Sequence, residues 1–373
     1  MLYTLGIFIT FFLAFILFTK MKKSIADKIL FGWLCVILLE LILFSLKTSN
    51  LHFKFHYFLG LEIPLPLLHG PFLFLYTKAL TDGNITFRKM FFHFIPYTIA
   101  FMSIVPFLLL EKKQKIYVYQ NEGEGYNSIT SIILLCIIIS GVIYTILSIL
   151  ALIKHKKRIK DHFSHTDKIN LEWLLRLIIG LSCIWILVFF ANDEIIFASV
   201  VFFVFFIGYY GIKQVGIFTN KHPLELTIDS ETSQDKDTLL APPKNTKYEK
   251  SYLTFNQIQE IHKRMIFLMI EKKLYIIQEL TLSMVAKELK VHPNTLSQVI
   301  NTIEQKNFFD YINMLRVEEF KEKITQPDSQ KYTLLSLAYE CGFNSKTSFN
   351  RNFKNHTGKS PSEYLKEVKI RFN

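Results

Sequence analysis

The chain has 373 residues, which is enough for two or more domains. Half of these residues are hydrophobic and the mean hydropathy is +0.27, which is unusual for a soluble protein and indicates a membrane-embedded portion. The formal net charge of +12 fits a negatively charged partner, such as nucleic acid or anionic lipid headgroups. The four cysteines form no CxxC pair and no cluster with histidine, so the sequence predicts neither a disulfide framework nor a metal site.

Seven apolar stretches precede residue 218, and each approaches the ~20 residues that a helix needs to cross a bilayer. Their approximate limits are 2–19, 29–46, 57–80, 90–110, 129–153, 169–190 and 195–217. The first lacks the basic residues that precede the apolar run of a signal peptide, so we expect a retained span with its N-terminus outside. The third contains Pro64, Pro66, Gly70 and Pro71, so we expect it to be kinked or broken. The last follows a very short connection and should form a tight hairpin with the sixth.

Charges in the loops predict the orientation of these spans. With the N-terminus outside, the loops on the cytoplasmic side hold thirteen Lys and Arg residues, and the outer loops hold five. An excess of Lys and Arg marks the cytoplasmic side. The sequence therefore predicts a multi-pass protein of the cell inner (cytoplasmic) membrane, whose C-terminal part lies in the cytoplasm.

Composition changes after the last apolar stretch. Residues 218–250 hold five basic and six acidic residues and a Pro-Pro pair, so we predict a flexible cytoplasmic linker. From residue 254 onward, short amphipathic helical patterns alternate with polar turns, and strand signals are nearly absent. The sequence thus predicts an all-α protein in three parts: a membrane domain (1–217), a linker (218–250) and a C-terminal domain (251–373).

Two helix pairs are predicted in the C-terminal domain. In the first, residues 281–301, the apolar residues Leu282, Val285, Ala286 and Leu289 face the next helix, which begins near Pro293. That second helix turns four polar residues outward: Asn294, Thr295, Gln298 and Asn301. Amide and hydroxyl groups on an outward helix face suit base edges in the DNA major groove, although such a face is as often merely solvated.

The second pair, residues 333–355, repeats this plan. Cys341-Gly342-Phe343 forms the turn, and Ser345 is placed to cap the following helix. Phe349 and Phe353 are predicted to point inward, and five residues outward: Lys346, Thr347, Asn350, Arg351 and Lys354. The helix predicted within residues 304–325 would hold the two pairs at a fixed separation.

Residues from about 254 to 373 resemble the DNA-binding domain of the AraC/XylS family of transcriptional regulators. The stretch AYECGFNSKTSFNRNFKNHTGKSPSEYLK, residues 338–366, carries the resemblance, with Gly342-Phe343, Ser345, Arg351, Gly358 and Pro361 at the positions of the family pattern. One departure is Gln305, which stands where the family usually has glycine.

The resemblance implies two helix-turn-helix units that place recognition helices in successive segments of the major groove. Position by position, it implies base contacts from six residues: Asn294, Gln298, Lys346, Thr347, Asn350 and Arg351. Lys354, Lys359 and the helix start at Ser360 are better placed for phosphates, which fix register rather than sequence. Family members often act as dimers and contact RNA polymerase, so both are expected partners beside double-stranded DNA.

The membrane half is similar to the multi-span regions found on some regulators of this family in the Bacteroidetes, which implies a sensor for an unknown signal ligand. The similarity lies in LPLLHGPFLFLYTKALT, residues 65–81. Charged or titratable residues inside spans usually have a function, so Glu40, Glu62 and His69 are candidate sensing residues. The alternative is that they only form hydrogen bonds between helices.

The leading hypothesis is a membrane-bound one-component transcriptional regulator. The alternatives are a transporter or other membrane protein with a regulatory DNA-binding tail, and a factor whose spans serve only as an anchor. The sequence contains no phosphate loop, metal cluster or nucleophile–base motif, so we expect neither enzymatic activity nor a cofactor.

Overall fold

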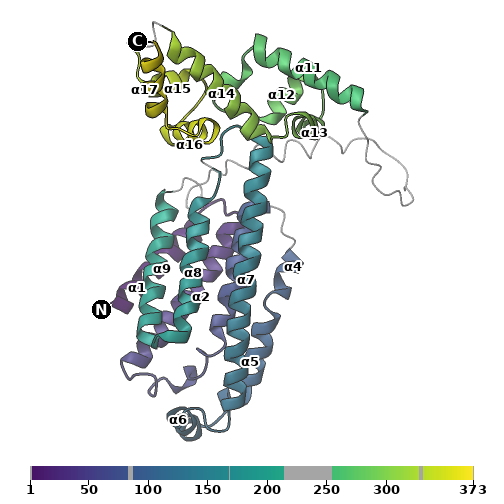
Figure 1. Ribbon diagram of the computed structural model, residues 1–373. Helices are drawn as coiled ribbons and strands as arrows, with labels where there is room; N and C mark the ends of the chain where they lie inside the picture. Colours follow the sequence, from purple (N-terminus) through teal and green to yellow (C-terminus); the bar gives the residue numbers. More distant parts are fainter. Residues whose placement is uncertain (1, 83–86, 168, 214–253, 327–330, 373) are drawn as a thin grey trace, which may run out of the picture. The chain divides into compact units, whose positions relative to one another are not determined.

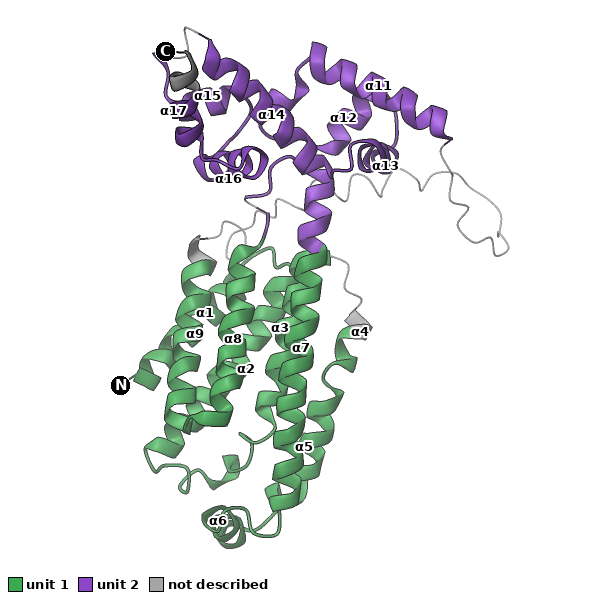
Figure 2. Ribbon diagram, in the orientation of Figure 1, with its two compact units in different colours: residues 1–154, 171–237 green, residues 155–170, 238–373 purple. Residues whose placement is uncertain are grey.

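The computed structural model describes residues 2–82, 87–167, 169–213, 254–326 and 331–372 (Figure 1). Within these residues the regular secondary structure is helical, apart from one isolated antiparallel bridge between Phe163 and Thr281, so the all-α prediction is confirmed. The chain forms two compact units, residues 1–154 with 171–237 and residues 155–170 with 238–373 (Figure 2). The predicted linker 218–250 lies outside the described residues.

Unit 1 is a bundle of apolar helices. Its helices are α1 (Leu2–Thr19), α2 (Ile25–Thr48), α3 (His69–Asp82), α4 (Phe87–Phe92), α5 (Ile95–Leu108), α6 (Lys112–Gln120), α7 (Asn127–His162), α8 (Glu172–Phe190) and α9 (Asp193–Lys213), with 3₁₀ turns η1 (His56–Phe58) and η2 (Leu65–Leu68). Among the described residues, five of these helices are long and apolar enough to cross a membrane: α1, α2, α7, α8 and α9. Five of the predicted apolar stretches are thereby found as single long helices.

The third and fourth predicted spans are not single long helices. Pro64 lies just before the 3₁₀ turn η2 and Pro66 lies within it. An α-helix begins only at His69, so α3 has 14 residues. Helices α5 and α6 form a pair bent by 115°, which raises the number of candidate spans to six if the pair counts as one. The count of seven spans therefore stays a prediction.

The core of unit 1 lies where α1, α2, α3, α8 and α9 pack together. Trp33, Leu34, Leu73, Leu174 and Val204 are fully buried there. By contrast, large apolar side chains on the outer faces of α1 and α7 are exposed, among them Phe8, Phe11, Phe15, Ile132, Leu135 and Ile139. Water-soluble proteins rarely expose so large an apolar surface, whereas a bilayer solvates it.

Unit 2 is also helical and contains two cores. Its helices are α11 (Phe255–Glu271), α12 (Leu282–Leu289), α13 (Pro293–Ile303), α14 (Phe308–Thr325), α15 (Leu334–Glu340), α16 (Lys346–Thr357) and α17 (Pro361–Phe372), with the 3₁₀ turn η3 (Leu274–Ile276). The first core includes Met265, Val285 and Ile300, and the second includes Phe320, Phe349 and Phe353. Residues 155–170, which include the end of α7, belong to this unit although they lie far from it in sequence.

Local signals in the sequence account for the residues at which these helices begin. Side chains of Thr254, Thr281, Asn307, Thr333 and Ser345 each accept a hydrogen bond from a backbone amide in the first turn of the following helix. Several chain reversals of unit 2 have a positive φ, among them Gln305 at +53° and Gly342 at +92°. Gln305, which stands where the family usually has glycine, thus takes the left-handed conformation that glycine adopts more readily.

Candidate nucleic-acid interface

Two helix pairs in unit 2, α12–α13 and α15–α16, are closed by the same backbone hydrogen bond. The Val291 amide donates to the Ala286 carbonyl (3.0 Å), and the Phe343 amide donates to the Ala338 carbonyl (3.1 Å). Both alanines are fully buried, so the small side chain allows close packing at the turn. This correspondence supports the repeat that the sequence predicted.

Helix α13 separates an apolar face from a polar face. The ring of His292 accepts a hydrogen bond from the Asn294 amide (3.2 Å), and Pro293 occupies the first helical position, where its missing N–H costs nothing. Leu296, Val299 and Ile300 are buried in the first core. Two of the predicted base-contacting residues are exposed on the opposite face: Asn294 and Gln298.

Helix α16 has the same division. Ser345 caps its start by accepting a hydrogen bond from the Ser348 amide (3.1 Å). Phe349 and Phe353 pack against the ring of Phe320, with ring centroids 4.7 and 5.5 Å apart. The other four predicted base-contacting residues are exposed along the outer face: Lys346, Thr347, Asn350 and Arg351. These four residues therefore combine two cations with amide and hydroxyl groups.

Helix α14 braces the two pairs. Its first half packs Phe308 and Ile312 into the first core, and its second half packs Val317 and Phe320 into the second. Polar contacts reinforce this, because the Glu319 carboxylate accepts hydrogen bonds from Lys273 Nζ and from the Tyr275 hydroxyl, both at 2.8 Å. One buried helix thus fixes the separation of the two polar faces, as the sequence predicted.

Residues 285–367, from α12 to α17, match the family described as a helix-turn-helix domain. The match supports an AraC-type regulator that binds DNA. Domains of this kind are typically non-enzymatic. A solved structure of a protein of unknown function from Listeria innocua is 25% identical over 28% of this chain and 94% of that chain, with a TM-score of 0.25, which does not establish a common fold. No curated protein matches the chain significantly.

The three predicted phosphate-contacting residues of the helix-turn-helix domain differ in their surroundings. Lys354 is exposed on α16. Lys359 forms an ion pair with Glu367 (2.6 Å). Ser360 is engaged by Glu363, whose carboxylate accepts hydrogen bonds from the Ser360 amide and hydroxyl and thereby holds the pKa of Glu363 below its ordinary value. A phosphate at Ser360 would have to displace this carboxylate.

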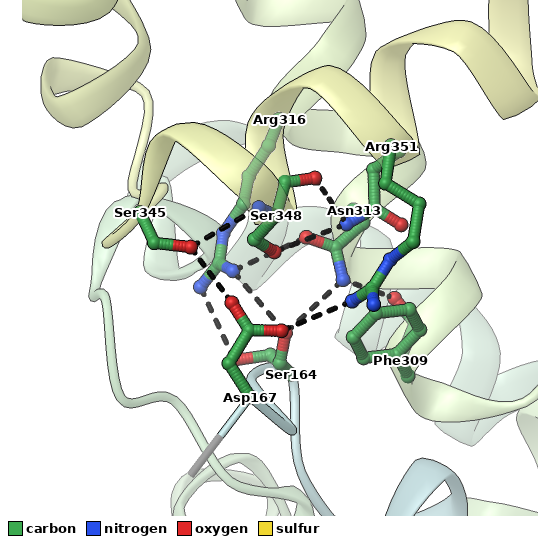
Figure 3. Close-up of polar contacts among 9 residues, drawn as sticks. Ser164, Asp167, Phe309, Asn313, Arg316, Ser345, Ser348 and Arg351 are labelled. Atoms are coloured by element: carbon green, nitrogen blue, oxygen red, sulfur yellow. Dashed lines mark hydrogen bonds and ion pairs between the residues drawn. The ribbon is translucent and has the colours of Figure 1, made fainter. Parts of the chain in front are cut away.

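The sequence did not predict that Arg351 is engaged by an acidic residue 184 positions away. Asp167 Oδ1 accepts a hydrogen bond from Arg351 Nη2 (3.1 Å), and Asp167 Oδ2 accepts one from the Ser345 hydroxyl (2.7 Å) (Figure 3). The carboxylate therefore lies at the N-terminus of α16, where the helix dipole favours negative charge. It occupies a position suited to a DNA phosphate or a base acceptor.

Residues 163–167 are held in unit 2 by buried polar contacts. The Ser164 amide and hydroxyl both donate to the Leu280 carbonyl, at 3.2 and 2.7 Å. The Ser164 carbonyl accepts from Asn313 Nδ2 (3.0 Å) and Arg316 Nη1 (3.4 Å), and its hydroxyl accepts from Arg316 Nη2 (3.1 Å) (Figure 3). Because all these atoms are buried, the segment is part of the fold of unit 2 and not a loosely attached loop.

Arg316 is the centre of this network. It is 2% exposed, and its guanidinium also donates to the carbonyls of Tyr275 and Ile277, both at 2.7 Å. Burial lowers the pKa of Arg316 to about 10, which still leaves the group positively charged at neutral pH. Neither Arg316 nor Ser164 nor Asp167 carries a sequence signal that links them, because the contacts join segments about 150 or more residues apart.

The three candidate sensing residues all line one cavity in unit 1. Its volume is about 270 Å³. Glu40 Oε2 and His69 Nε2 are 2.8 Å apart, and Glu62 forms a hydrogen bond with Tyr119. Helix α2 thus supplies Glu40 to the same cavity as Glu62 and His69, which lie 22 and 29 residues further along the chain. Among the described residues, no group of three or more His, Cys, Asp or Glu is arranged to hold a metal ion.

Proposed function

We propose that this protein is a membrane-bound one-component transcriptional regulator whose two helix-turn-helix units bind duplex DNA. The observation that carries the proposal is the pair of exposed polar faces on α13 and α16, braced by the buried helix α14 in the part of the chain that matches the helix-turn-helix family. Two recognition helices at a fixed separation are what sequence-specific contact with successive major-groove segments requires.

In this proposal Asn294 and Gln298 contact bases from α13. Lys346, Thr347, Asn350 and Arg351 contact bases from α16, with Arg351 binding guanine through two hydrogen bonds. Lys354, Lys359 and Ser360 contact phosphates. RNA polymerase and a second copy of the chain are the further partners that regulation of transcription would involve.

The proposed location is the cytoplasmic membrane, with the AraC-type domain in the cytoplasm. The apolar candidate spans and the thirteen-to-five excess of Lys and Arg in the loops on one side support it. Residues 155–170 and the C-terminal helices belong to the same compact unit, which adds support. Two parts of one unit lie on the same side of the membrane, so the chain between them must cross the membrane an even number of times. Helices α8 and α9 supply two.

We further propose that the segment 163–167 regulates DNA binding. It joins two candidate spans, α7 and α8, and its residue Asp167 binds the same Arg351 that would contact guanine. A carboxylate at this position would repel the DNA backbone and occupy an arginine nitrogen that two-point guanine contact needs. DNA binding then requires Asp167 to leave, and a rearrangement of the spans that moves this segment would change DNA affinity.

The test is DNA binding by the full-length protein in lipid nanodiscs. Selection from random duplexes first defines the preferred site, and affinity is then measured at several salt concentrations. We expect strong salt dependence and, for Arg351→Ala, a loss of discrimination of about 1–3 kcal/mol at one or two base pairs. Lys263→Ala, an exposed change on α11, is the matched control and should leave the preferred sequence unchanged.

Absence of any DNA binding at low salt would refute the proposed function. Equal weakening by Arg351→Ala on all sequences would instead make Arg351 a phosphate contact. Substrate uptake that survives removal of residues 218–373 would favour the alternative of a transporter with a regulatory tail.

A further inference from the structure

The cavity in unit 1 has mainly apolar walls. Helices α2, α8 and α9 and the segment between α2 and α3 enclose it, and its lining includes Phe44, Leu181, Trp185, Phe197 and Phe203. The rings of Phe44 and Phe197 are stacked with centroids 3.9 Å apart. Its volume of about 270 Å³ lies just below the usual range for ligand pockets, so it fits only a small molecule. These walls suit a small molecule with an aromatic or aliphatic body.

A chain of hydrogen bonds at the cavity defines which nitrogen of His69 carries a proton. Trp33 Nε1 can only donate, and it lies 3.0 Å from His69 Nδ1, so this nitrogen is the acceptor. The proton of a neutral imidazole is then on Nε2, which donates to Glu40 Oε2 at 2.8 Å. Trp33 and His69 therefore supply the Glu40 carboxylate with one hydrogen bond and no positive charge.

The other oxygen of Glu40 has no hydrogen-bond partner. Oε1 is buried, and the Glu40 side chain is only 7% exposed. A buried carboxylate oxygen without a donor is costly, and in native proteins such an atom needs an explanation. Because Glu40 lines the cavity, a bound molecule is able to provide the missing donor.

Among the described groups that line the cavity, His69 is the titratable side chain bonded to Glu40. Lys47 forms an ion pair with Asp193 (2.7 Å), and both side chains are about half exposed. Glu62 is hydrogen-bonded to Tyr119, and His52 completes the set of titratable groups that line the cavity. Lys47 also acts electrostatically on Glu62, so Glu40 is the buried carboxylate of the described lining that pairs with no lysine or arginine.

We infer that this cavity is a binding site for a protonated lipophilic amine, whose ammonium group donates to Glu40 Oε1 while its apolar body lies against Phe44 and Phe197. The inference rests on the proposed function, since it names the class of signal ligand that the membrane unit would bind. A carboxylic acid of the same size would face the Glu40 carboxylate, whose like charge repels it. A neutral alcohol would donate one hydrogen bond but leave the charge of Glu40 uncompensated.

The probe for this site is 2-phenylethylamine, with 3-phenylpropanoate and 2-phenylethanol as matched ligands of opposite and zero charge. Binding is measured by equilibrium dialysis against the full-length protein in lipid nanodiscs, and empty nanodiscs correct for partitioning into lipid. We expect saturable binding of the amine, weaker binding of the alcohol and none of the acid. Equally tight binding of the acid would overturn the inference.

Substitutions then locate the site. Glu40→Gln keeps the shape of the side chain but places an amide where the carboxylate was, so amine affinity should fall about 10-fold or more. Glu111→Gln, an exposed change at the start of α6 outside the cavity, should have no effect. Unchanged amine affinity in Glu40→Gln would refute the assignment. If Glu40→Gln does not fold, Glu40→Asp keeps the charge and should retain selectivity for the amine over the acid.

Measurement of DNA binding on the same preparations separates the two proposals. DNA binding without amine binding contradicts the cavity assignment and leaves the regulator intact. Amine binding without DNA binding supports the cavity and contradicts the proposed function. An amine that binds and also changes DNA affinity supports both.

Discussion

Replacement of Asp167 by asparagine removes the negative charge at the start of α16 while keeping the size of the side chain. The asparagine carbonyl still accepts a hydrogen bond from the Ser345 hydroxyl, so the variant mainly loses two electrostatic contributions. One is the ion pair with Arg351, and the other is the interaction of a carboxylate with the helix N-terminus. Both stabilise the arrangement in which Arg351 binds Asp167, so their loss should leave Arg351 available to DNA and strengthen DNA binding.

The structure sets the size of the effect. Arg351 and Asp167 side chains are 43% and 24% exposed, so solvent screens their ion pair, which contributes about 0.2–1 kcal/mol. A carboxylate at a helix N-terminus adds about 0.3–1 kcal/mol. The sum of about 0.5–2 kcal/mol corresponds to roughly 2- to 30-fold tighter DNA binding by Asp167→Asn, where release of Asp167 precedes binding.

The assay is a DNA titration of the full-length protein in nanodiscs, followed by fluorescence anisotropy of a labelled duplex. Asp161→Asn is the matched control, because it makes the same change of charge in the last turn of α7, six residues before Asp167, without a contact to Arg351 or Ser345. Equal effects of the two substitutions would indicate only a general rise in positive charge. Unchanged or weaker DNA binding by Asp167→Asn would refute the reasoning.

Two further predictions concern the stability of unit 2. Gly342→Ala should destabilise it by at least about 2 kcal/mol in denaturant unfolding, because φ is +92° and the new Cβ would lie 2.6 Å from the Tyr275 carbonyl oxygen. Gly358→Ala is the control, because φ is +77° there and no atom lies within 4 Å of the new Cβ, so it should cost only the backbone strain of about 1–2 kcal/mol. Equal losses of unfolding free energy in the two variants would exclude a steric origin of the Gly342→Ala effect. Although burial opposes it, hydrogen bonds from Lys273 and Tyr275 hold the pKa of Glu319 below its ordinary 4.5. Its contribution to stability is therefore complete above about pH 4.5 and lost as pH falls through the lowered pKa, so Glu319→Gln should flatten the acid limb of a stability–pH profile measured by thermal unfolding.

Several features could be predicted from the sequence because they depend on neighbours along the chain. Periodic apolar residues such as Leu296, Val299 and Ile300 predict the buried face of α13, and the structure confirms that they are buried. Ser345 was expected to cap α16 and does so. The exposure of Asn294, Gln298 and the outer residues of α16 also follows from helical periodicity. Their contacts with DNA stay predictions.

Other features could not be predicted because they join distant segments. The third apolar stretch has the composition of a span, but Pro64 and Pro66 precede an α-helix of only 14 residues. Gln305 departs from the family pattern, and its φ of +53° shows that the backbone keeps the left-handed turn without glycine. Glu40 and His69 each stand out as titratable residues in apolar runs, yet only the fold shows that they are 2.8 Å apart.

The sequence by itself determined the all-helical character, the repeated helix pair and the position of most helix ends, because hydrophobic period and capping act over three to five residues. Only the tertiary structure decided which residues far apart in the chain contact one another. It pairs Asp167 with Arg351 and inserts Ser164 beside Arg316, so that residues 155–170 belong to the unit of the C-terminal helices. The physical reason is that a buried guanidinium needs acceptors from wherever the fold supplies them, and no local pattern specifies a partner more than 150 residues away.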